Sequence, residues 1–261
     1  MTVVRVADAS GGWELAHGAP APILSGAVRR ICGYVERTGA PLRRSELPEA
    51  AVTVILSLGP RMRIDGARHD SFVAALYDRP ALTEHDGVQH GLELKLSPPG
   101  ARRLLGVPLG ELHNATVPLD VVLDTGTLLE ELAEAPDWET RFARVDAELT
   151  RRLAAAPAPH PAVRAAWRAL VASRGTVAIG QLADELGWSR RHLAARFRED
   201  VGASPKFLAR LLRFEHATER IRAGATALGD VALACGYYDQ AHLNREVREF
   251  TGGAPRALRG S

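Results

Sequence analysis

One segment occurs twice in the C-terminal part of the chain, and this repeat constrains the fold more than any other feature. The first copy, GWSRRHLAARFREDVGASP, runs from Gly187 to Pro205, and the second, GYYDQAHLNREVREFTGGAP, runs from Gly236 to Pro255. The offset is 49 residues at the glycines and 50 from the histidines onward, so the second copy has one extra residue after its glycine. Such a repeat predicts a duplicated supersecondary unit.

The first copy and the residues before it have the pattern of two helices joined by a glycine turn. Before the turn, apolar residues at i, i+3, i+4 and i+7 indicate one helix face: Ile179, Leu182, Ala183 and Leu186. Gly187 can adopt the left-handed conformation that ends a helix, and Ser189 is a good N-cap for the next one. Leu193 and Phe197 then form a buried i, i+4 pair. A short buried helix, a turn and a basic exposed helix predict a helix-turn-helix, whose second helix enters a DNA major groove.

The second copy repeats this plan, and a longer helix connects the two. In the second copy the residues predicted to be buried are Val231, Ala232, Cys235, Leu243, Val247 and Phe250. The connecting helix starts with Ser204 as cap and Pro205 in the first turn, and it ends at Gly224. One apolar stripe of this helix should face both units: Phe207, Leu211, Phe214, Thr218 and Ile221.

With these motifs the chain resembles the AraC/XylS family of bacterial transcription regulators over residues 160–259. The residues that match the pattern of the family's second unit are Ala232, Gly236, Tyr237, Asp239, His242, Leu243, Arg245, Arg248, Gly252, Pro255 and Arg259. The first unit matches through Gly202, Ser204, Pro205 and Lys206. Three positions depart from the family pattern, namely Ala241, Val247 and Leu258. They are small or apolar, which indicates a slightly different core.

The resemblance implies which residues meet DNA. The base-contacting positions carried over from the family are Arg190, Arg191, Ala194, Ala195, Asp239, Gln240, Ala241, Asn244 and Arg245. We expect phosphate contacts from Ser189, Arg198, Lys206 and Arg248. Arginine suits both tasks, because its fork reaches guanine O6 and N7 together or grips a phosphate. For His192 and His242 a role in helix packing or facing phosphate is favoured over base reading.

Charge is distributed unevenly between the two halves of the chain. Residues 162–261 carry 16 Lys and Arg against 10 Asp and Glu, whereas the remainder carries 17 against 21. An arginine-rich composition alone does not explain this asymmetry. It places the basic surface on the half that contains the repeat, as binding to phosphates requires.

The N-terminal half has the pattern of short strands followed by helices. Residues 1–50 show little periodicity, apart from a weak strand candidate at 28–35. Later strands are expected at 52–58, 62–64, 71–77 and 88–96, the last with a clear alternation of apolar and polar residues. Helices are expected at 98–106, 127–135 and 138–154. This half resembles the cupin-like regulatory domain of the same family, which implies an antiparallel β barrel or sandwich with helices.

We therefore expect an α+β protein of two domains. Residues 1–155 form a regulatory, effector-binding or dimerisation domain, and residues 162–261 form an all-α double helix-turn-helix domain. The Pro-rich segment 156–161 is an extended linker between them. The chain lacks a signal peptide pattern or a long apolar run, so it is expected to be cytoplasmic and without membrane contact.

Catalysis, cofactors and metals are not expected. His69, His85, His90 and Glu93 are available in the predicted strands but lack the close His-x-His pair common in cupin metal sites. His90 falls on the apolar phase of its strand, which favours a hydrogen-bonded core or pocket histidine. Cys32 and Cys235 are far apart and favour small core residues or free thiols over a disulfide.

The sequence thus predicts a sequence-specific transcription regulator that binds promoter DNA. A small molecule or a partner protein acting on the N-terminal domain would control it, and RNA polymerase and a second copy of the chain are further expected partners. One alternative remains open, in which the N-terminal half is only a dimerisation platform and a partner protein regulates the DNA-binding module.

Overall fold

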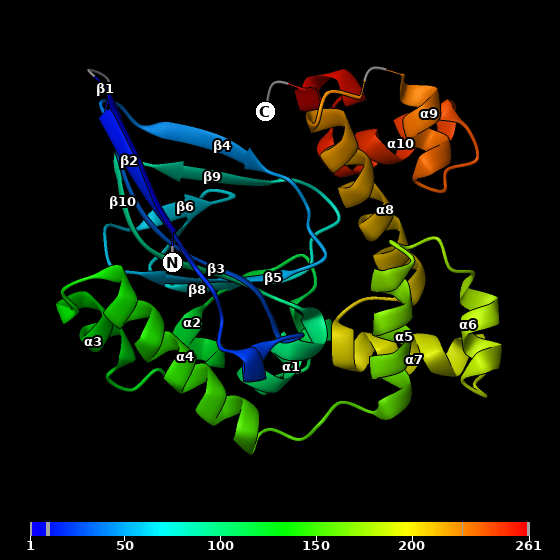
Figure 1. Ribbon diagram of the computed structural model, residues 1–261, viewed down its shortest axis with the longest axis horizontal. Coiled ribbons are helices and arrows are strands. Elements are labelled where there is room, and N and C mark those ends of the chain that lie inside the picture. The colour runs from blue at the N-terminus through cyan, green and yellow to red at the C-terminus, as the bar shows by residue number, and fades with distance from the viewer. Residues whose placement is uncertain (1, 9–10, 226, 260–261) are drawn as a thin grey trace.

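The computed structural model describes residues 2–8, 11–225 and 227–259, which form two parts (Figure 1). Up to Ala155 the chain forms two β-sheets with helices beside them, and from Pro161 onward it is helical. Residues 156–160 connect the last helix of the first part to the first helix of the second. The predicted combination of an antiparallel β-rich part and a helix-turn-helix part is confirmed.

In the described residues, the larger sheet has seven antiparallel strands in the order β1-β2-β3-β10-β5-β8-β11. Their bounds are β1 Thr2–Asp8, β2 Gly11–Gly18, β3 Val28–Thr38, β5 Val52–Ser57, β8 Phe72–Ala74, β10 Val88–Leu96 and β11 Thr116–Pro118. Strand β10 is central and buries Leu92, Leu94 and Leu96 on one face, as its alternation predicts. Its opposite face carries Glu93 and Lys95.

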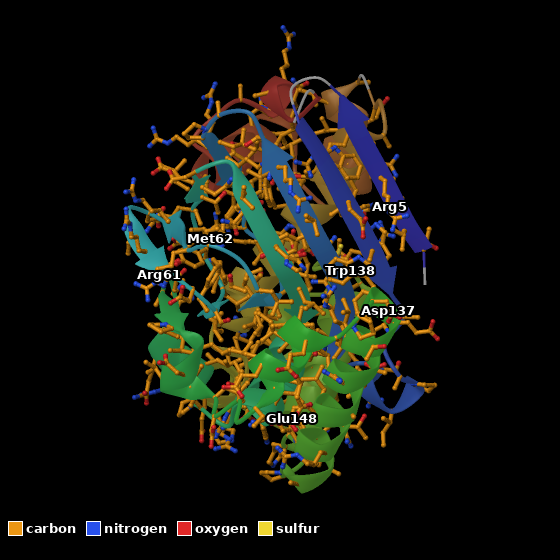
Figure 2. All side chains as sticks on the ribbon, turned by 90° about the vertical axis from the view of Figure 1, so that its left-hand side faces the viewer. Arg5, Arg61, Met62, Asp137, Trp138 and Glu148 are labelled. Atoms are coloured by element: carbon orange, nitrogen blue, oxygen red, sulfur yellow. The ribbon has the colours of Figure 1, made fainter. Side chains whose placement is uncertain are left out.

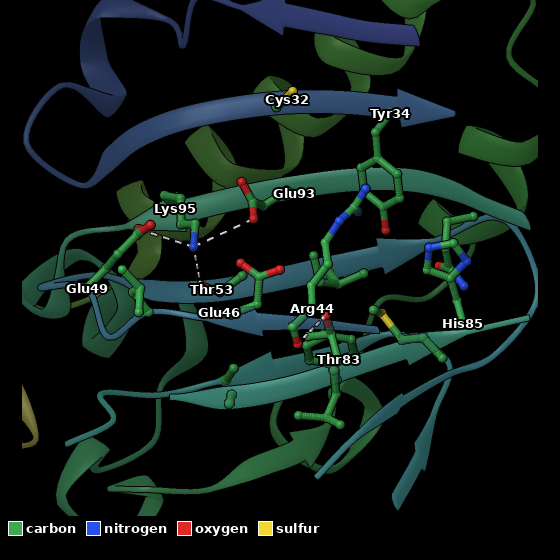
Figure 3. Close-up of a pocket in the computed structure, with 18 of the residues that line it drawn as sticks. Cys32, Tyr34, Arg44, Glu46, Glu49, Thr53, Thr83, His85, Glu93 and Lys95 are labelled. Carbon is green, nitrogen blue, oxygen red and sulfur yellow. Dashed lines mark hydrogen bonds and ion pairs between the residues drawn. The ribbon is translucent and has the colours of Figure 1, made fainter. Parts of the chain in front are cut away.

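The smaller sheet contains β4 Leu42–Glu46, β9 Ala81–His85, β6 Met62–Ile64 and β7 Ala67–His69, in the order β4-β9-β6-β7. Ile64 of this sheet packs with Ile55 and Phe72 of the larger one in a separate apolar cluster. The two sheets therefore face each other with apolar side chains between them, an arrangement that leaves room for a cavity (Figure 3).

Helices cover the opposite face of the larger sheet. They are η1 Pro22–Leu24, α1 Pro98–Leu105, η2 Leu109–Leu112, α2 Leu119–Val122, α3 Leu128–Glu134 and α4 Trp138–Ala155. Ser97 caps α1 by accepting a hydrogen bond from the Gly100 N–H at 3.2 Å. Trp138, at the start of α4 beside strands β2 and β3 (Figure 2), donates its indole N–H to Glu14 of β2. Its ring packs over Gly33, where a Cβ atom would lie 2.4 Å from it, so only glycine fits at this position.

The C-terminal part consists of helices with a shared core. They are α5 Pro161–Ala172, α6 Ile179–Glu185, α7 Arg190–Val201, α8 Pro205–Arg222, α9 Leu228–Ala234, α10 Gln240–Thr251 and η3 Pro255–Arg259. The predicted stripe of α8 is confirmed, because Leu211, Phe214, Thr218 and Ile221 are buried and Phe207 is half-buried. None of the helices in the described residues is long and apolar enough to cross a membrane.

The structure corrects two expectations from the sequence. The described residues between 2 and 46 form β1 to β4 and η1, and the weak candidate at 28–35 is part of the eleven-residue strand β3. Buried and exposed residues do not alternate regularly along β3 and β4, and charged residues interrupt the apolar ones. The two-residue periodicity that identifies a strand in the sequence is therefore weak here. Helix α5 was also not anticipated, although His160 caps it and Pro161 occupies its first turn.

Candidate nucleic-acid interface and a cavity in the N-terminal part

Both copies of the repeat fold into the same turn. Gly187 and Gly236 have positive φ angles of 66° and 74°. In each copy the residue after the glycine donates its N–H to a carbonyl five residues earlier, Trp188 to Ala183 and Tyr237 to Ala232, both at 2.9 Å. The glycines allow this left-handed turn at no steric cost. The predicted duplication is therefore present as a duplicated helix-turn-helix, α6–α7 and α9–α10.

The second helix of each unit is capped at both ends by its own sequence. Ser189 Oγ accepts from the His192 N–H at 3.1 Å, and Asp239 Oδ1 accepts from the His242 N–H at 2.7 Å. Gly202 and Gly252 end these helices in the left-handed conformation. The predicted core residues are confirmed, since the following are all buried: Leu193, Phe197, Leu243, Val247 and Phe250.

Most of the predicted base-contacting residues lie exposed on these two helices. In α7, Arg190, Arg191 and Ala195 are exposed and Ala194 is half-buried. In α10, Gln240, Ala241 and Arg245 are exposed and Asn244 is half-buried. Asp239 precedes α10 and uses its carboxylate as the N-cap, so one of its oxygens is already engaged. The structure brings the predicted residues together in two sets, one for each helix.

The predicted phosphate-contacting residues are exposed as well. Arg198 lies in the last turn of α7, Arg248 in the last turn of α10, and Lys206 in the first turn of α8. Ser189 serves as the N-cap of α7. Lys206 and Arg245 line one shallow groove between α8 and α10, which also contains Arg210, Arg213 and His242. Glu246 and Glu249 line the same groove and pair with Arg210 and Arg213, so Lys206 and Arg245 are its basic side chains outside these pairs among the described lining residues.

A buried ion-pair network fixes α10 on α8. Glu246 of α10 is 3% exposed and accepts from Arg210 Nε at 2.8 Å, and its carboxylate lies 3.7 Å from Arg213. Arg213 in turn donates to the Gly175 carbonyl and stacks on the Tyr237 ring. Burial, and then the nearby Glu246 carboxylate, raise the pKa of Tyr237 and keep it a neutral phenol. The orientation of α10 therefore depends on a carboxylate that sequence analysis did not single out.

Tyr238 is another residue that sequence analysis did not assign to the interface. It is the extra residue of the second copy, it stands directly before the cap of α10, and its side chain is 88% exposed. The one-residue difference in the repeat offset is the signal that identifies it. An exposed tyrosine at the entry of a recognition helix can donate to a phosphate or pack on a base.

The N-terminal part contacts the first recognition helix at its C-terminal end. Helix α7 meets α1 and η2, where Leu109 packs against Gly202 and Gly110 lies against the Arg198 carbonyl. His113 also stacks edge-on against Phe207 of α8, with ring centroids 5.3 Å apart. The N-terminal residues of α7, Arg190 and Arg191, remain exposed. In helix-turn-helix proteins the N-terminal residues of the second helix contact base edges.

A second contact between the two parts, the Ala50 latch, involves Arg29, Ala50 and Glu215. The Ala50 N–H donates to Glu215 Oε1 of α8 at 2.5 Å, and Arg29 donates to the Ala50 carbonyl at 2.9 Å. Arg29 also pairs with Glu215 at 3.6 Å. Ala50 is fully buried in the core of the helical part, although it belongs to the segment after β4.

The segment between β4 and this latch borders a cavity between the two sheets, with a volume of about 470 Å³. Figure 3 shows its polar side chains: Tyr34, Arg44, Glu46, Glu49, Glu93 and Lys95. Its size lies in the range of small-molecule sites. His85 lies at one end with its Nε2 atom 3.3 Å from Glu36. Among the described residues no three His, Cys, Asp or Glu side chains gather as metal ligands would.

His90 differs from its expected role in one respect. It packs edge-on against Trp138 and is half-buried, but its Nε2 atom has no hydrogen-bond partner among the described residues. Desolvation and the nearby Arg141 and Arg37 lower its pKa, so it stays neutral.

Cys32 and Cys235 are both buried free thiols, as predicted.

The two helix-turn-helix units on one shared helix define a DNA-binding class of domain, and the sequence comparison agrees. Residues 182–261 match the family model described as a helix-turn-helix domain. The protein thus carries a helix-turn-helix domain at its C-terminus.

Curated relatives match the chain in this region only. An uncharacterized HTH-type transcriptional regulator of Staphylococcus aureus is 29% identical over 84 residues, which cover 32% of this chain and 11% of that protein. The probable bifunctional transcriptional activator/DNA repair enzyme AlkA of Mycobacterium tuberculosis is 38% identical over 81 residues, 31% of this chain and 16% of that protein. The chain therefore spans a small fraction of the length of these relatives.

Two solved structures illustrate the similarity at the level of the fold. ToxT from Vibrio cholerae aligns with a TM-score of 0.47 and 11% identity, over 85% of this chain and 96% of that chain. The C-terminal domain of AraT, a response regulator from Geobacillus stearothermophilus, aligns with a TM-score of 0.37 and 22% identity, over 39% of this chain and 86% of that one.

We predict that Glu246→Ala destabilises the protein by about 2–4 kcal/mol, because it leaves two arginines facing a buried site without their carboxylate. Glu249→Ala is the matched control, since Glu249 pairs with the same Arg210 but its side chain is 61% exposed. Its loss should cost less than about 1 kcal/mol. Denaturant unfolding measures both, and equal costs would contradict the assigned role of Glu246.

Proposed function

We propose that this protein is a sequence-specific, DNA-binding regulator of transcription. The observation that carries the proposal is the pair of recognition helices, each capped by its own sequence and each with exposed arginines, fixed on the single helix α8. Two rigidly joined recognition helices can enter successive major grooves on one face of DNA, about 10 base pairs apart. Promoter DNA is then the main partner, and the regulator acts through RNA polymerase.

The exposed side chains divide into two roles. Arg191 and Arg245 lie on the recognition helices and are proposed to read bases through bidentate contacts, as guanine recognition requires. Lys206 and Arg248 lie at helix ends and are proposed to contact phosphates, which adds affinity without sequence information. The excess of basic residues in this part supports the second role.

We further propose that the N-terminal part controls DNA binding through a small molecule in the cavity between its sheets. The Ala50 latch supports this proposal, because the segment 46–50 borders the cavity at one end and is held by α8 at the other. A ligand that shifts this segment changes its contact with the helix that aims both recognition helices. In the alternative, the N-terminal part is only a dimerisation platform, and then no small molecule alters DNA affinity.

We predict that Arg191→Ala or Arg245→Ala weakens binding to a cognate site by about 1–3 kcal/mol and relaxes specificity at one base position. Lys206→Ala and Arg248→Ala should weaken binding to all sequences alike and reduce the salt dependence by about one unit of slope. Fluorescence anisotropy on cognate and scrambled duplexes at several salt concentrations separates the two effects. Unchanged affinity and specificity in both pairs would refute the assignment.

For the Ala50 latch we predict a pH dependence that Glu215→Gln removes. Burial raises the pKa of the Glu215 carboxyl above its ordinary value of 4.5, although Arg29 and the Ala50 N–H lower it. The folded protein then holds this proton more tightly than the unfolded chain, so stability falls as pH rises from 4.5 through the raised pKa. The glutamine variant, neutral throughout, should lack this decline.

The control for this prediction is Glu219→Gln, because Glu219 lies one turn further along α8 with a side chain 69% exposed. Stability measured by denaturant unfolding between pH 4 and pH 8 should follow the wild-type profile in the control. An unchanged profile in Glu215→Gln would contradict the role given to the latch.

A further inference from the structure

The cavity between the two sheets carries a charge pattern that selects one class of ligand. We propose that it binds an organic cation with an apolar body, such as an aromatic or aliphatic amine or a quaternary ammonium compound. This inference rests on the proposed control by a small molecule and specifies the ligand of that site. It follows from which charged groups of the cavity already have partners and which do not.

Both basic side chains that line the cavity are already paired. Lys95 Nζ lies 3.0 Å from Thr53 Oγ1, 3.2 Å from Glu49 and 3.6 Å from Glu93 (Figure 3). Arg44 forms a bidentate pair with Glu36, through Nη1 at 2.8 Å and through Nη2. An anionic ligand would therefore have to break a charge-assisted hydrogen bond before it could form its own.

Glu46 is the acidic side chain of the lining that lacks such a partner. It lies on β4 and points into the cavity in Figure 3. Its carboxylate is exposed and forms no hydrogen bond or ion pair within bonding distance in the described part of the chain. The nearby Arg44 attracts it through space but is hydrogen-bonded to Glu36. Arg30 of β3 does not line the cavity and pairs with Glu93, so it does not neutralise Glu46 either. A ligand with positive charge gains an attraction here without breaking an existing pair.

Tyr34 supplies a second unused polar group. Its hydroxyl points into the cavity (Figure 3) and forms no hydrogen bond with a described residue. Desolvation, and then the carboxylate of Glu93, raise its pKa, so the phenol remains neutral. A neutral tyrosine presents both a hydroxyl acceptor and an electron-rich ring to a cation.

The rest of the lining is suited to an apolar body. Trp13 stands at the edge, and Leu15, Ile55, Ile64 and Phe72 form the walls. Faces of tryptophan, tyrosine and phenylalanine attract ammonium groups within about 6 Å of the ring centroid, and this attraction is stronger where water is excluded. The volume of about 470 Å³ is sufficient for a molecule of one or two rings.

The position of Glu46 also connects the ligand to the Ala50 latch. Leu47, Pro48 and Glu49 border the same cavity. The next residue, Ala50, donates its N–H to Glu215. A cation drawn to Glu46 thus engages the segment whose far end is fixed on α8. Binding at this point can change the latch without contact between the ligand and the DNA-binding helices.

The test uses the full chain and two probes of similar apolar body and opposite charge, benzyltrimethylammonium and 3-phenylpropionate. Calorimetric titration should show the cation binding about tenfold or more tightly than the anion. Glu46→Gln should weaken cation binding about tenfold, and Lys95→Gln should not weaken it. Glu134→Gln is the matched control, because Glu134 is exposed on α3 away from the cavity, and it should leave binding unchanged.

Three results would overturn the proposal. The first is that 3-phenylpropionate binds more tightly than the cation and that Lys95→Gln abolishes this binding. The second is that Glu46→Gln does not change the affinity for the cation. The third is that the cation does not bind at millimolar concentration although the protein shows a normal unfolding transition. DNA affinity measured in the same samples separates this inference from the proposed function. Cation binding at Glu46 with unchanged DNA affinity would support the ligand class and refute control by the cavity.

Discussion

The structure depends on the packing of helix α8 against both helix-turn-helix units. Phe214 of α8 contacts Phe250 of α10 with ring centroids 4.9 Å apart, and Leu208 and Leu211 are buried in the core that also holds Phe197 of α7. Because both recognition helices pack on the same rigid element, their separation and orientation are set by one helix. A change in α8 therefore alters the orientation of both α7 and α10. A change in α7 or α10 alone leaves the orientation of the other helix unaltered.

The same helix is the point at which the N-terminal part can act. Glu215 lies on the side of α8 that faces Ala50, and Phe207 meets His113 near its first turn. The N-terminal part also rests against the end of α7 while leaving Arg190 and Arg191 exposed. These contacts combine the polar bond at Glu215 with apolar packing, since Ala50 is buried in the core of the helical part and Leu109 packs against Gly202. A short segment, residues 46–50, connects the cavity to this contact, and the proposed control rests on that connection.

Much of the DNA-binding part could be predicted because its signals are local. Gly187, Gly236 and the caps Ser189 and Asp239 act within a few residues of themselves, so repeat spacing reveals them. Strand β10 was predictable for the same reason, since alternation along one strand reflects one buried face. Contacts between residues that are far apart in the sequence produce no local sequence pattern. The bond between Ala50 and Glu215 joins residues far apart in sequence, and strands β1 to β4 owe their form to neighbours in the sheet.

The central claim is that two recognition helices on one rigid helix read DNA as a single unit. The most direct measurement is binding of the purified protein to a genomic DNA library at near-physiological salt, followed by sequencing of the retained fragments. The account predicts an enriched motif with two short half-sites about one helical turn apart, on one face of the DNA. Retention without a motif, or a motif with a single half-site, would contradict it.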